Sequence, residues 1–192
     1  MTANRKYSAI VIGTSAGGLA ALTTVLGNLP ADKCVPIIVV QHRAKEQRDL
    51  LEEVLQRKCK LQVKQADEKE RLEKGVVYIA PPDYHLLVEN DLTLSLSSDE
   101  LVMYSRPSID VLFESAAMVY KERLTGILLT GASSDGTKGM QLIKQYGGLT
   151  IAQLPAEAQW PAMPKAAVDS GAAMQVLTLQ EIHETILNNY CS

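Results

Sequence analysis

The sequence predicts an α/β protein, with a three-layer doubly wound, mostly parallel sheet and an antiparallel edge hairpin. Short apolar runs that end in glycine or a polar residue alternate along the chain with helical segments. This order is typical of parallel strands that are buried on both faces. Only 5% of the 192 residues are aromatic while 46% are hydrophobic, so an aliphatic core is expected. No repeat, low-complexity segment or long linker interrupts the chain, and we expect a single domain over 1–192.

The first half of the chain begins with strand–helix units. The apolar runs 8–13 and 36–41 are each followed by a helical segment, 19–26 and 49–57, and Asp49 suits the first turn of the second helix. A weaker strand is expected at 61–63. A stronger one is expected at 76–80, where Pro81 and Pro82 end it. Residues 85–89 and 92–96 then flank Asn90 and Asp91. The second arm alternates leucine with serine or threonine, which predicts a half-exposed antiparallel hairpin at a sheet edge.

The second half returns to alternating helices and strands. Residues 109–120 place apolar side chains on one helical face, and 124–129 is a buried apolar run. A helix at 137–146 ends at Gly147 and Gly148, which suit a helix C-terminus. The remaining expected elements are a strand at 149–152, a helix at 165–170, a strand at 174–177 and a helix at 180–188. Ligand sites of such sheets lie beyond the carboxyl ends of the strands, so the loops there are the candidates for function.

Composition excludes several classes of protein. With 19 Lys and Arg against 22 Asp and Glu, the net charge is −3, and a nucleic-acid-binding protein would need a basic face and aromatic platforms. The first apolar stretch, about six residues long, is too short for a signal peptide or a membrane span. Cys34, Cys59 and Cys191 are odd in number and form no C-x-x-C pair, so neither a disulfide nor a zinc site is expected. We expect a cytoplasmic protein without metal or membrane insertion.

The first strand-end loop contains a candidate nucleophile. Gly13-Thr-Ser-Ala-Gly17 matches G-x-S-x-G, in which a sharp strand-to-helix turn exposes the serine, here Ser15. The N–H of Ala16 would lie at a helix N-terminus, where it could stabilise an oxyanion. Two alternatives stay open: a purely structural glycine-rich turn and a dinucleotide or phosphate loop. Ser15 disfavours the dinucleotide loop, because it replaces the middle glycine of that fingerprint.

Two further loops carry a candidate base and a candidate acid. His42 directly follows the strand 36–41 and could take the proton of Ser15, although a lone loop histidine is often structural. Asp135 follows the strand 124–129 and could orient that imidazole. Asp135 also precedes a helix, so helix capping is the alternative. The chain order Ser, His, Asp differs from the Ser, Asp, His of α/β-hydrolases. A trio with His183 would restore that order, but His183 lies within a polar C-terminal helix.

Several segments together resemble the catalytic domain of the chemotaxis protein-glutamate methylesterase (CheB-type) family. They occur in family order at family-like spacing over nearly the whole chain. They are Ile12-Gly-Thr-Ser-Ala-Gly-Gly18, Val40-Gln-His42, Tyr78-Ile-Ala-Pro-Pro-Asp-Tyr-His85, Ser105-Arg-Pro-Ser-Ile-Asp110, Leu129-Thr-Gly131, Asp135-Gly136, Ala152-Gln153 and Met163-Pro164. The resemblance implies hydrolysis of γ-glutamyl methyl esters on chemoreceptor helices, with release of methanol and, in some members, deamidation of glutamines. It implies that Ser15, His42 and Asp135 are the catalytic triad, without a cofactor.

The sequence departs from the family pattern in one loop. The family loop usually reads T-G-M-G-x-D-G, whereas Ala132 and Ser133 stand here in the methionine and glycine positions. Ala132 can still donate its backbone N–H to an oxyanion, but a different side chain could alter substrate preference. Family members usually also carry an N-terminal receiver domain, and only a few residues precede the first strand here. Either activity is unregulated in cis, a separate regulatory protein controls it, or the chain is a fragment.

Basic side chains surround the predicted rim. Arg43 follows His42, and Arg106 lies in a segment shared with the family, so both are expected to bind substrate. Lys45, Arg48 and Lys138 extend the set. Each is most simply a solvated surface charge, but together they would suit an acidic partner, the methylated cytoplasmic helix of a chemoreceptor. Asp83 and His85 are expected to be structural.

Overall fold

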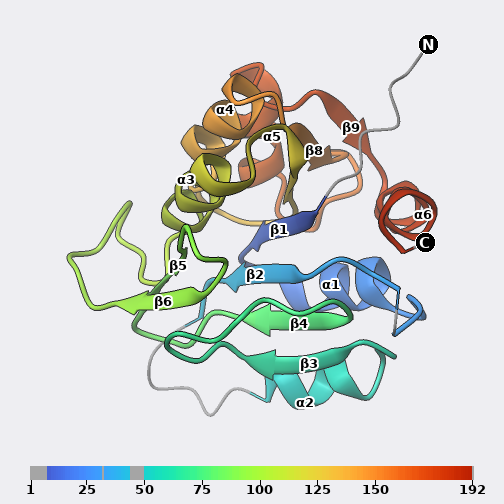
Figure 1. The fold of residues 1–192 in the computed structure, drawn as a ribbon. Coiled ribbons are helices and arrows are strands. Elements are labelled where there is room, and N and C mark those ends of the chain that lie inside the picture. Colours follow the sequence, from blue (N-terminus) through green and yellow to red (C-terminus); the bar gives the residue numbers. More distant parts are fainter. Residues whose placement is uncertain (1–7, 32, 44–49, 192) are drawn as a thin grey trace.

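The protein is described by a computed structural model that covers residues 8–31, 33–43 and 50–191. Within these residues, a seven-stranded parallel sheet has the strand order β3-β4-β2-β1-β7-β8-β9 (Figure 1). The strands are β1 (Ala9–Thr14), β2 (Ile37–Gln41), β3 (Gln62–Gln65), β4 (Val76–Ile79), β7 (Leu124–Leu128), β8 (Leu149–Gln153) and β9 (Gln175–Leu177). The predicted doubly wound α/β class is therefore confirmed.

Two helical layers cover the sheet. The helices are α1 (Gly18–Leu26), α2 (Leu51–Gln56), α3 (Ile109–Tyr120), α4 (Thr137–Gln145), α5 (Ala162–Asp169) and α6 (Leu179–Tyr190). Helices α1, α2 and α6 lie on one face and α3, α4 and α5 on the other (Figure 1). No helix in the described part of the chain is long and apolar enough to cross a membrane.

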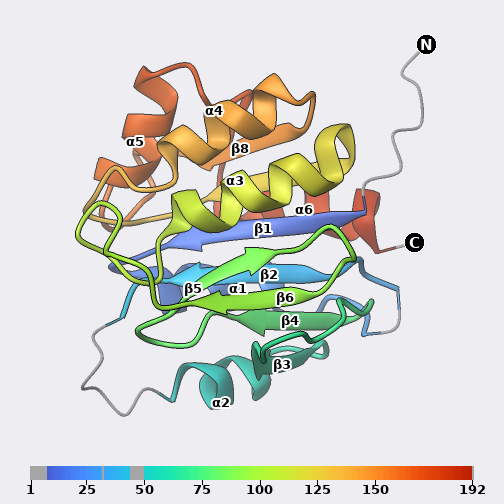
Figure 2. The same cartoon turned by 60° about the vertical axis from the view of Figure 1, so that its left-hand side comes forward.

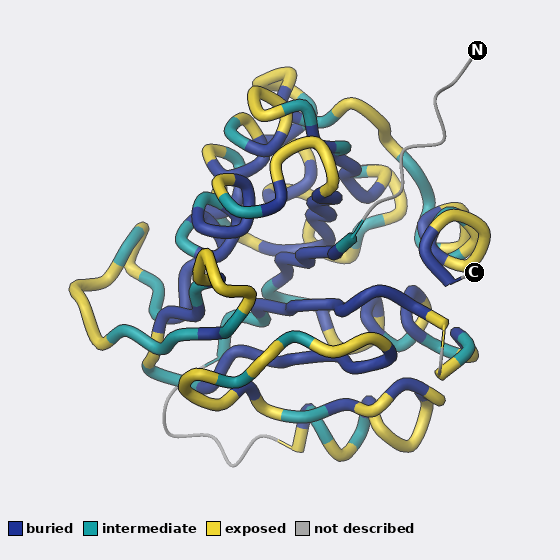
Figure 3. Tube along the Cα trace, in the orientation of Figure 1, coloured by how far each residue is buried: buried dark blue, intermediate teal, exposed yellow. Residues whose placement is uncertain are grey.

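The strands are apolar because both of their faces are covered. Along β1, Val11 belongs to the core beneath α3, while Ile10 and Ile12 belong to the core beneath α1. All three side chains are fully buried. Successive side chains of a strand point to opposite faces, so a strand between two helical layers must be apolar at every position. The central strands are accordingly buried throughout, as Figure 3 shows.

The predicted hairpin forms, but its expected place at the edge of the main sheet is wrong. Strands β5 (His85–Val88) and β6 (Leu94–Ser97) pair antiparallel in a sheet of their own. Buried Leu86, Val88 and Leu94 share a core with α3, and Figure 2 shows the hairpin beside that helix. The hairpin therefore covers a sheet face in the way that a helix would, because its apolar side chains are buried there.

The element boundaries differ from the prediction in detail. Helix α5 begins at Ala162, three residues before the predicted start at Lys165, because Pro161 precedes it and Pro164 falls within its first turn, where a missing N–H costs nothing. A short 3₁₀ helix, η1 (Lys121–Arg123), links α3 to β7. The acidic first-turn position predicted for Asp49 lies outside the described residues.

The expectation that the cysteines form no disulfide is wrong for one pair. Cys34 and Cys191 are disulfide-bonded, while Cys59 is free and buried. The two bonded cysteines are 157 residues apart in sequence, so no local spacing signals the pair. They meet because the end of α6 lies against the segment before β2, where the Val35 N–H donates to the Tyr190 carbonyl at 3.1 Å.

Candidate active site

Three neighbouring strands bring the candidate triad to one rim of the sheet. Strand β1 lies between β2 and β7, and all three run parallel. Thr14 is level with Gln41, and Gly13 is level with Leu128, so the three strands end together. Ser15 and His42 directly follow β1 and β2, and Asp135 lies in the loop after β7. Helices leave β1 and β7 toward opposite faces, which makes this the switch point at which doubly wound sheets bind ligands.

Thr130 fixes the loop that carries Ser15. The Ser15 N–H donates to the Thr130 carbonyl at 3.0 Å, and the Thr130 hydroxyl donates to the Ala16 carbonyl at 3.0 Å. The Thr130 N–H in turn donates to Oε1 of buried Gln153 at 2.8 Å, and the hydroxyl accepts the Trp160 N–H. Hydrogen bonds to a buried residue hold the loop in one conformation, because leaving these groups unpaired would cost free energy.

Glycines allow this loop to approach its neighbours closely. Gly17 has φ of +80°, a conformation that a residue with a side chain rarely adopts. A Cβ atom at Gly131 would lie 2.6 Å from the Met163 side chain and 3.0 Å from the Cβ of Ser15. A side chain at 131 would therefore have to displace the end of Met163 and would crowd Ser15, so glycine favours the close packing of the loops after β1 and β7.

His42 is hydrogen-bonded to the acid and not to the serine. Its Nε2 lies 2.8 Å from Oδ2 of Asp135, and its side chain is 14% exposed. Because a carboxylate can only accept, Nε2 carries the proton in this pair and Nδ1 is left as an acceptor. The hydrogen bonds of the described residues include none between Ser15 Oγ and His42. The side-chain amide of Gln41 links the backbone at the two residues, because it donates to the carbonyls of both Ser15 and His42.

The Asp135 carboxylate is completely buried and accepts four hydrogen bonds. Oδ2 accepts from His42 Nε2 and from the Ile109 N–H at 2.7 Å. Oδ1 accepts from the Ser108 hydroxyl and from the Asp110 N–H, both at 3.0 Å. Burial by itself raises the pKa of this carboxyl group. The hydrogen bonds from His42, Asp110 and Ile109 outweigh that effect and hold the pKa below its ordinary value.

The expected alternative, in which Asp135 caps the helix that follows it, is wrong. The N-cap of α4 is Gly136, with φ of +93° and no side-chain hydrogen bond. Asp135 instead occupies the N-terminus of α3, where it accepts two of the backbone N–H groups that have no partner within the helix. A carboxylate at that end also interacts favourably with the helix dipole.

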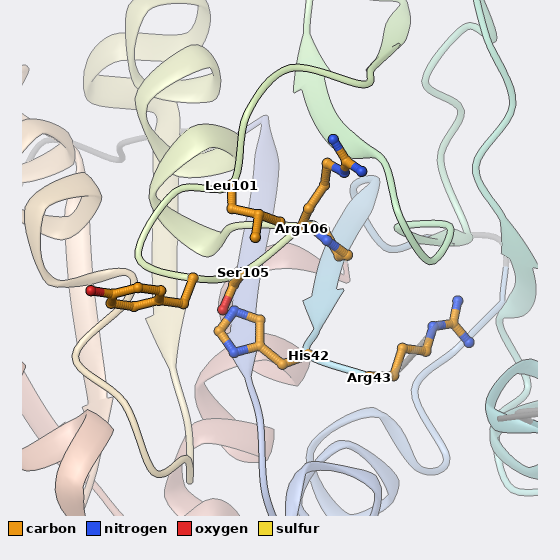
Figure 4. A pocket seen from close by; sticks show the side chains of 7 residues that line it. His42, Arg43, Leu101, Ser105 and Arg106 are labelled. Carbon is orange, nitrogen blue, oxygen red and sulfur yellow. The ribbon is translucent and has the colours of Figure 1, made fainter. Parts of the chain in front are cut away.

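Two pockets meet at His42. One is lined by Ser15, Ala16, the first turn of α1, Gln41, His42 and Gln159. The other, of about 340 Å³, is lined by His42, Arg43, Leu101, Tyr104, Ser105, Arg106 and Pro107. Figure 4 shows the His42 ring beside Ser105 and the Arg43 side chain directed away from the ring. His42 therefore contributes to the walls of both pockets, and Ser15 lines one of them.

Both arginines that were expected to bind substrate line the second pocket but already have protein partners. Arg43 pairs with Glu52 at 2.7 Å and donates to the Ala80 carbonyl at 2.9 Å. Arg106 pairs with Asp83 at 2.7 Å, and it also donates to the carbonyls of residues 98 and 99. Their positive charges are thus compensated in this structure.

Other sequence-derived candidates lie at or away from the rim. Ala16 lines the Ser15 pocket, whereas exposed Ala132 lines neither pocket. Among the hydrogen bonds of the described residues, the N–H groups of both have no protein acceptor. His183 lies in α6 and bonds the Val25 carbonyl of α1, which excludes it from the trio. Lys138 is exposed beside Asp135, and the remaining basic candidates, Lys45 and Arg48, lie outside the described residues.

Sequence reasoning missed the residues that hold the site together. Thr130 lies just after β7 and Gln153 is the last residue of β8, and a polar side chain at the end of a buried strand was a usable signal. The roles of Ser108 and His85 had no such signal, although His85 was expected to be structural. His85 Nδ1 accepts the Ser108 N–H at 3.1 Å, and its Nε2 donates to the Glu100 carbonyl. In the described part of the chain, no cluster of three or more His, Cys, Asp or Glu side chains could hold a metal.

The fold and the rim chemistry define a hydrolase of the doubly wound α/β class. A buried acid–histidine pair and a partly buried serine at a strand-to-helix turn, all on one rim, form the arrangement that serine-type hydrolases use. The chain belongs to the CheB methylesterase family, whose model matches residues 10–186. This membership supports the hydrolase prediction and not the nucleotide- or phosphate-binding alternative.

Relatives and a solved structure agree with this membership. A relative from Leptospira interrogans is 46% identical over 181 residues, which cover 94% of each chain. The protein-glutamate methylesterase/protein-glutamine glutaminase of Archaeoglobus fulgidus is 39% identical, and the match covers 93% of this chain but 52% of that relative. The crystal structure of the Thermotoga maritima CheB methylesterase catalytic domain superposes with a TM-score of 0.90 at 35% identity, over 94% of this chain and 97% of that one.

Proposed function

We propose that this protein hydrolyses γ-glutamyl methyl esters on the cytoplasmic helix of a methylated chemoreceptor, releases methanol, and works in the cytoplasm. Family membership and the activity that the name of the Archaeoglobus relative gives support the reaction. The observation that carries the proposal is the 2.8 Å hydrogen bond between His42 and buried Asp135, beside the pocket that contains Ser15. The name of that relative also includes glutaminase activity, and a glutamine side chain would enter the same acyl-transfer chemistry.

In the proposed mechanism, Ser15 is the nucleophile and His42 is the general base. Ser15 Oγ bonds to the ester carbonyl carbon while its proton passes to Nδ1 of His42, because Nε2 is already engaged by Asp135. Ser15 Oγ and Nδ1 of His42 must first come within hydrogen-bond distance of each other. Catalytic hydrogen bonds of this kind often form only in the substrate complex. The low pKa of Asp135 keeps that carboxylate ionised at neutral pH, so it stabilises the imidazolium that forms.

Backbone N–H groups would stabilise the negative oxygen of the tetrahedral intermediate. Ala16 donates from the turn that follows Ser15, and Ala132 donates from the loop after β7. One such donor contributes about 3 kcal/mol of transition-state stabilisation in related hydrolases. His42 then returns its proton to the methoxy oxygen, methanol leaves, and an acyl-serine remains. Water attacks this ester with His42 again as base, which frees the glutamate and regenerates Ser15.

The second pocket is the proposed place for the segment of substrate that flanks the ester. Arg106 and Arg43 would contribute its walls, held in position by Asp83 and Glu52. Because both arginines are already paired with protein carboxylates, they would shape the pocket more than they would bind a charged group of the substrate.

A serine-reactive fluorophosphonate probe tests the nucleophile directly. We expect the wild-type protein to be labelled at Ser15. The Ser15→Ala variant should lose this labelling and keep its thermal unfolding midpoint. Ser170→Ala is the matched control, because Ser170 is an exposed serine at the end of α5 whose hydroxyl bonds only the Ala167 carbonyl. Labelling of Ser15→Ala at the wild-type rate would overturn the assignment of Ser15.

A further inference from the structure

Asp110 is a buried carboxylate that the mechanism above does not use. It lies in the first turn of α3 and its side chain is only 3% exposed. Its Oδ1 accepts the Gly139 N–H at 2.8 Å, and Gly139 lies in the first turn of α4. Asp110 therefore caps a helix other than its own, and it attaches the start of α3 to the start of α4.

Asp135 makes the reverse connection. It directly precedes the N-cap of α4, yet its carboxylate accepts the N–H groups of Ile109 and Asp110 at the start of α3. The two aspartates thus exchange helix caps across the interface between α3 and α4. Each cap depends on the other, because each carboxylate holds the helix end that presents N–H groups to its partner.

Close packing of the two helices makes this exchange possible. A Cβ atom at Gly139 would overlap the Cβ atom of Phe113 and would also lie 3.3 Å from the Asp110 carbonyl, so glycine lets α4 approach α3 this closely. The cost is that two carboxylates lie near each other in the interior. Burial first, and then the charges of Asp135 and Glu114, raise the pKa of Asp110 to about 6, against the lowering effect of the Gly139 N–H.

We propose that Asp110 is a positioning residue for the hydrolysis, which holds the Asp135 carboxylate in line with His42 by attaching the start of α4 to the start of α3. This inference rests on the proposed function. The Asp135 carboxylate is oriented by two N–H groups of α3. The bond from the Gly139 N–H to Asp110 holds the start of α4, next to the Asp135 loop, in place relative to those groups. Loss of this contact leaves Ser15, His42 and Asp135 present but Asp135 and His42 misaligned.

Two substitutions at Asp110 separate positioning from charge. Asp110→Ala removes the acceptor for the Gly139 N–H. Asp110→Asn keeps an oxygen acceptor for the Gly139 N–H, removes the negative charge and replaces the other carboxylate oxygen with an NH₂ group. For methanol release from methylated receptor, we expect Asp110→Ala to lower kcat by about 10- to 100-fold, the usual effect of a small misplacement of a catalytic group. KM should stay within about twofold, because no substrate contact is lost. Asp110→Asn should restore most of kcat.

A helix cap elsewhere in the fold provides the matched control. Thr178 caps α6 by accepting the Glu181 N–H, and α6 lies on the opposite face of the sheet from α3 and α4. Thr178→Ala should lower the unfolding midpoint, as loss of a cap does, without changing kcat. A role of Asp110 in stability alone would therefore leave kcat of the folded enzyme unchanged in Asp110→Ala as well.

The outcomes are distinguishable from failure of the proposed function. Ser15→Ala is measured in parallel, and unchanged methanol release in that variant would contradict the proposed function itself. Loss of activity in Ser15→Ala together with wild-type kcat in Asp110→Ala would overturn only the positioning role. Equal losses of kcat in Asp110→Ala and Asp110→Asn would also overturn it, because the charge and not the cap would then be responsible.

Discussion

The Asp135 carboxylate shows how single residues of this site are defined by their hydrogen bonds. All four of its contacts are donors: the His42 ring, the Ser108 hydroxyl and two backbone N–H groups. An ionised carboxylate, which only accepts, satisfies every one of them. Charge-assisted hydrogen bonds of this kind are stronger than neutral ones. The residue is therefore fixed both in its ionisation state and in its orientation toward His42.

Asp135→Asn is expected to inactivate the enzyme while leaving it folded. The NH₂ group of asparagine cannot accept, so it must face at least one of the four donors. If it faces His42, the ring must turn or change tautomer. We expect kcat for methanol release to fall on the order of 10⁴-fold, as for the equivalent change in serine proteases. A loss of only a few fold in steady-state assays of the folded variant would make Asp135 a helix cap and nothing more.

Ser15 and His42 could be predicted from sequence and the surroundings of Asp135 could not. Ser15 and His42 directly follow apolar strands, and parallel strands bring such positions to one rim. The partners of Asp135 lie 25 to 93 residues away in sequence, on another strand end and another helix. Local sequence therefore indicated capping of the following helix, whereas tertiary packing directs the carboxylate to α3.

At the scale of elements, the adjacent N-termini of α3 and α4 determine the position of Asp135. Both helices lie on the same face of the sheet and share one core. Each helix start is capped by the aspartate associated with the other, Asp135 for α3 and Asp110 for α4. This arrangement places a second buried acid, Asp110, close enough to Asp135 for the charge of Asp135 to help raise its pKa.

Asp110 predicts a specific dependence of stability on pH. Its pKa of about 6 in the folded protein exceeds the ordinary 3.8, so the folded state holds more protons than the unfolded state between these values. The contribution of Asp110 to the free energy of unfolding therefore falls as pH rises through this window, by up to about 3 kcal/mol, and is constant above it. The pKa of Asp135 is lowered, so its contribution to the free energy of unfolding changes with pH in the opposite direction. Asp135 is present in both proteins compared below, so this contribution is common to them.

Urea unfolding of wild type and Asp110→Asn checks this expectation. The variant lacks the titration, so its free energy of unfolding relative to wild type should increase from about pH 4 to about pH 7 and then stay level. The partners of the Asp110 oxygen are the same in both proteins if the amide oxygen faces Gly139. A difference between the two proteins that does not change with pH would show that Asp110 has an ordinary pKa.

The types of the elements could be predicted from sequence, because burial on two faces leaves a clear apolar pattern. The long-range contacts between elements could not be predicted in this way. The strands and helices of the main sheet follow from runs and periodicity. The hairpin was predicted as a hairpin, but its place against α3 depends on Leu86 and Leu94 fitting a core that other elements create. The Cys34–Cys191 disulfide likewise depends on where α6 ends.

At the scale of the whole molecule, an acidic protein must bind the proposed receptor helix. The net charge is −3, and the two arginines of the second pocket are paired internally. Lys138, in contrast, is exposed at the rim end of α4, and among the ion pairs of the described residues none includes it. The electrostatic attraction for an acidic helix should therefore be modest and local.

Lys138→Gln is expected to weaken receptor binding without changing the chemistry. KM for methylated receptor should rise about two- to threefold at low salt, and kcat should stay constant, because rim charges affect mainly association. The KM of wild type should rise between roughly 50 and 300 mM NaCl, as screening predicts. Lys144→Gln is the matched control, since Lys144 lies in the last turn of the same helix, away from the rim. A KM that is independent of salt would contradict docking by charge.

Release of methanol from purified methylated receptor is the measurement that tests the central claim most directly. With receptor that carries isotopically labelled methyl groups, the wild-type protein should release labelled methanol, and Ser15→Ala should release none above the uncatalysed background. Unfolding midpoints of the two proteins, measured in the same buffer, should agree. Methanol release by folded Ser15→Ala at the wild-type rate, or no release by the wild type, would contradict hydrolysis through Ser15, His42 and Asp135.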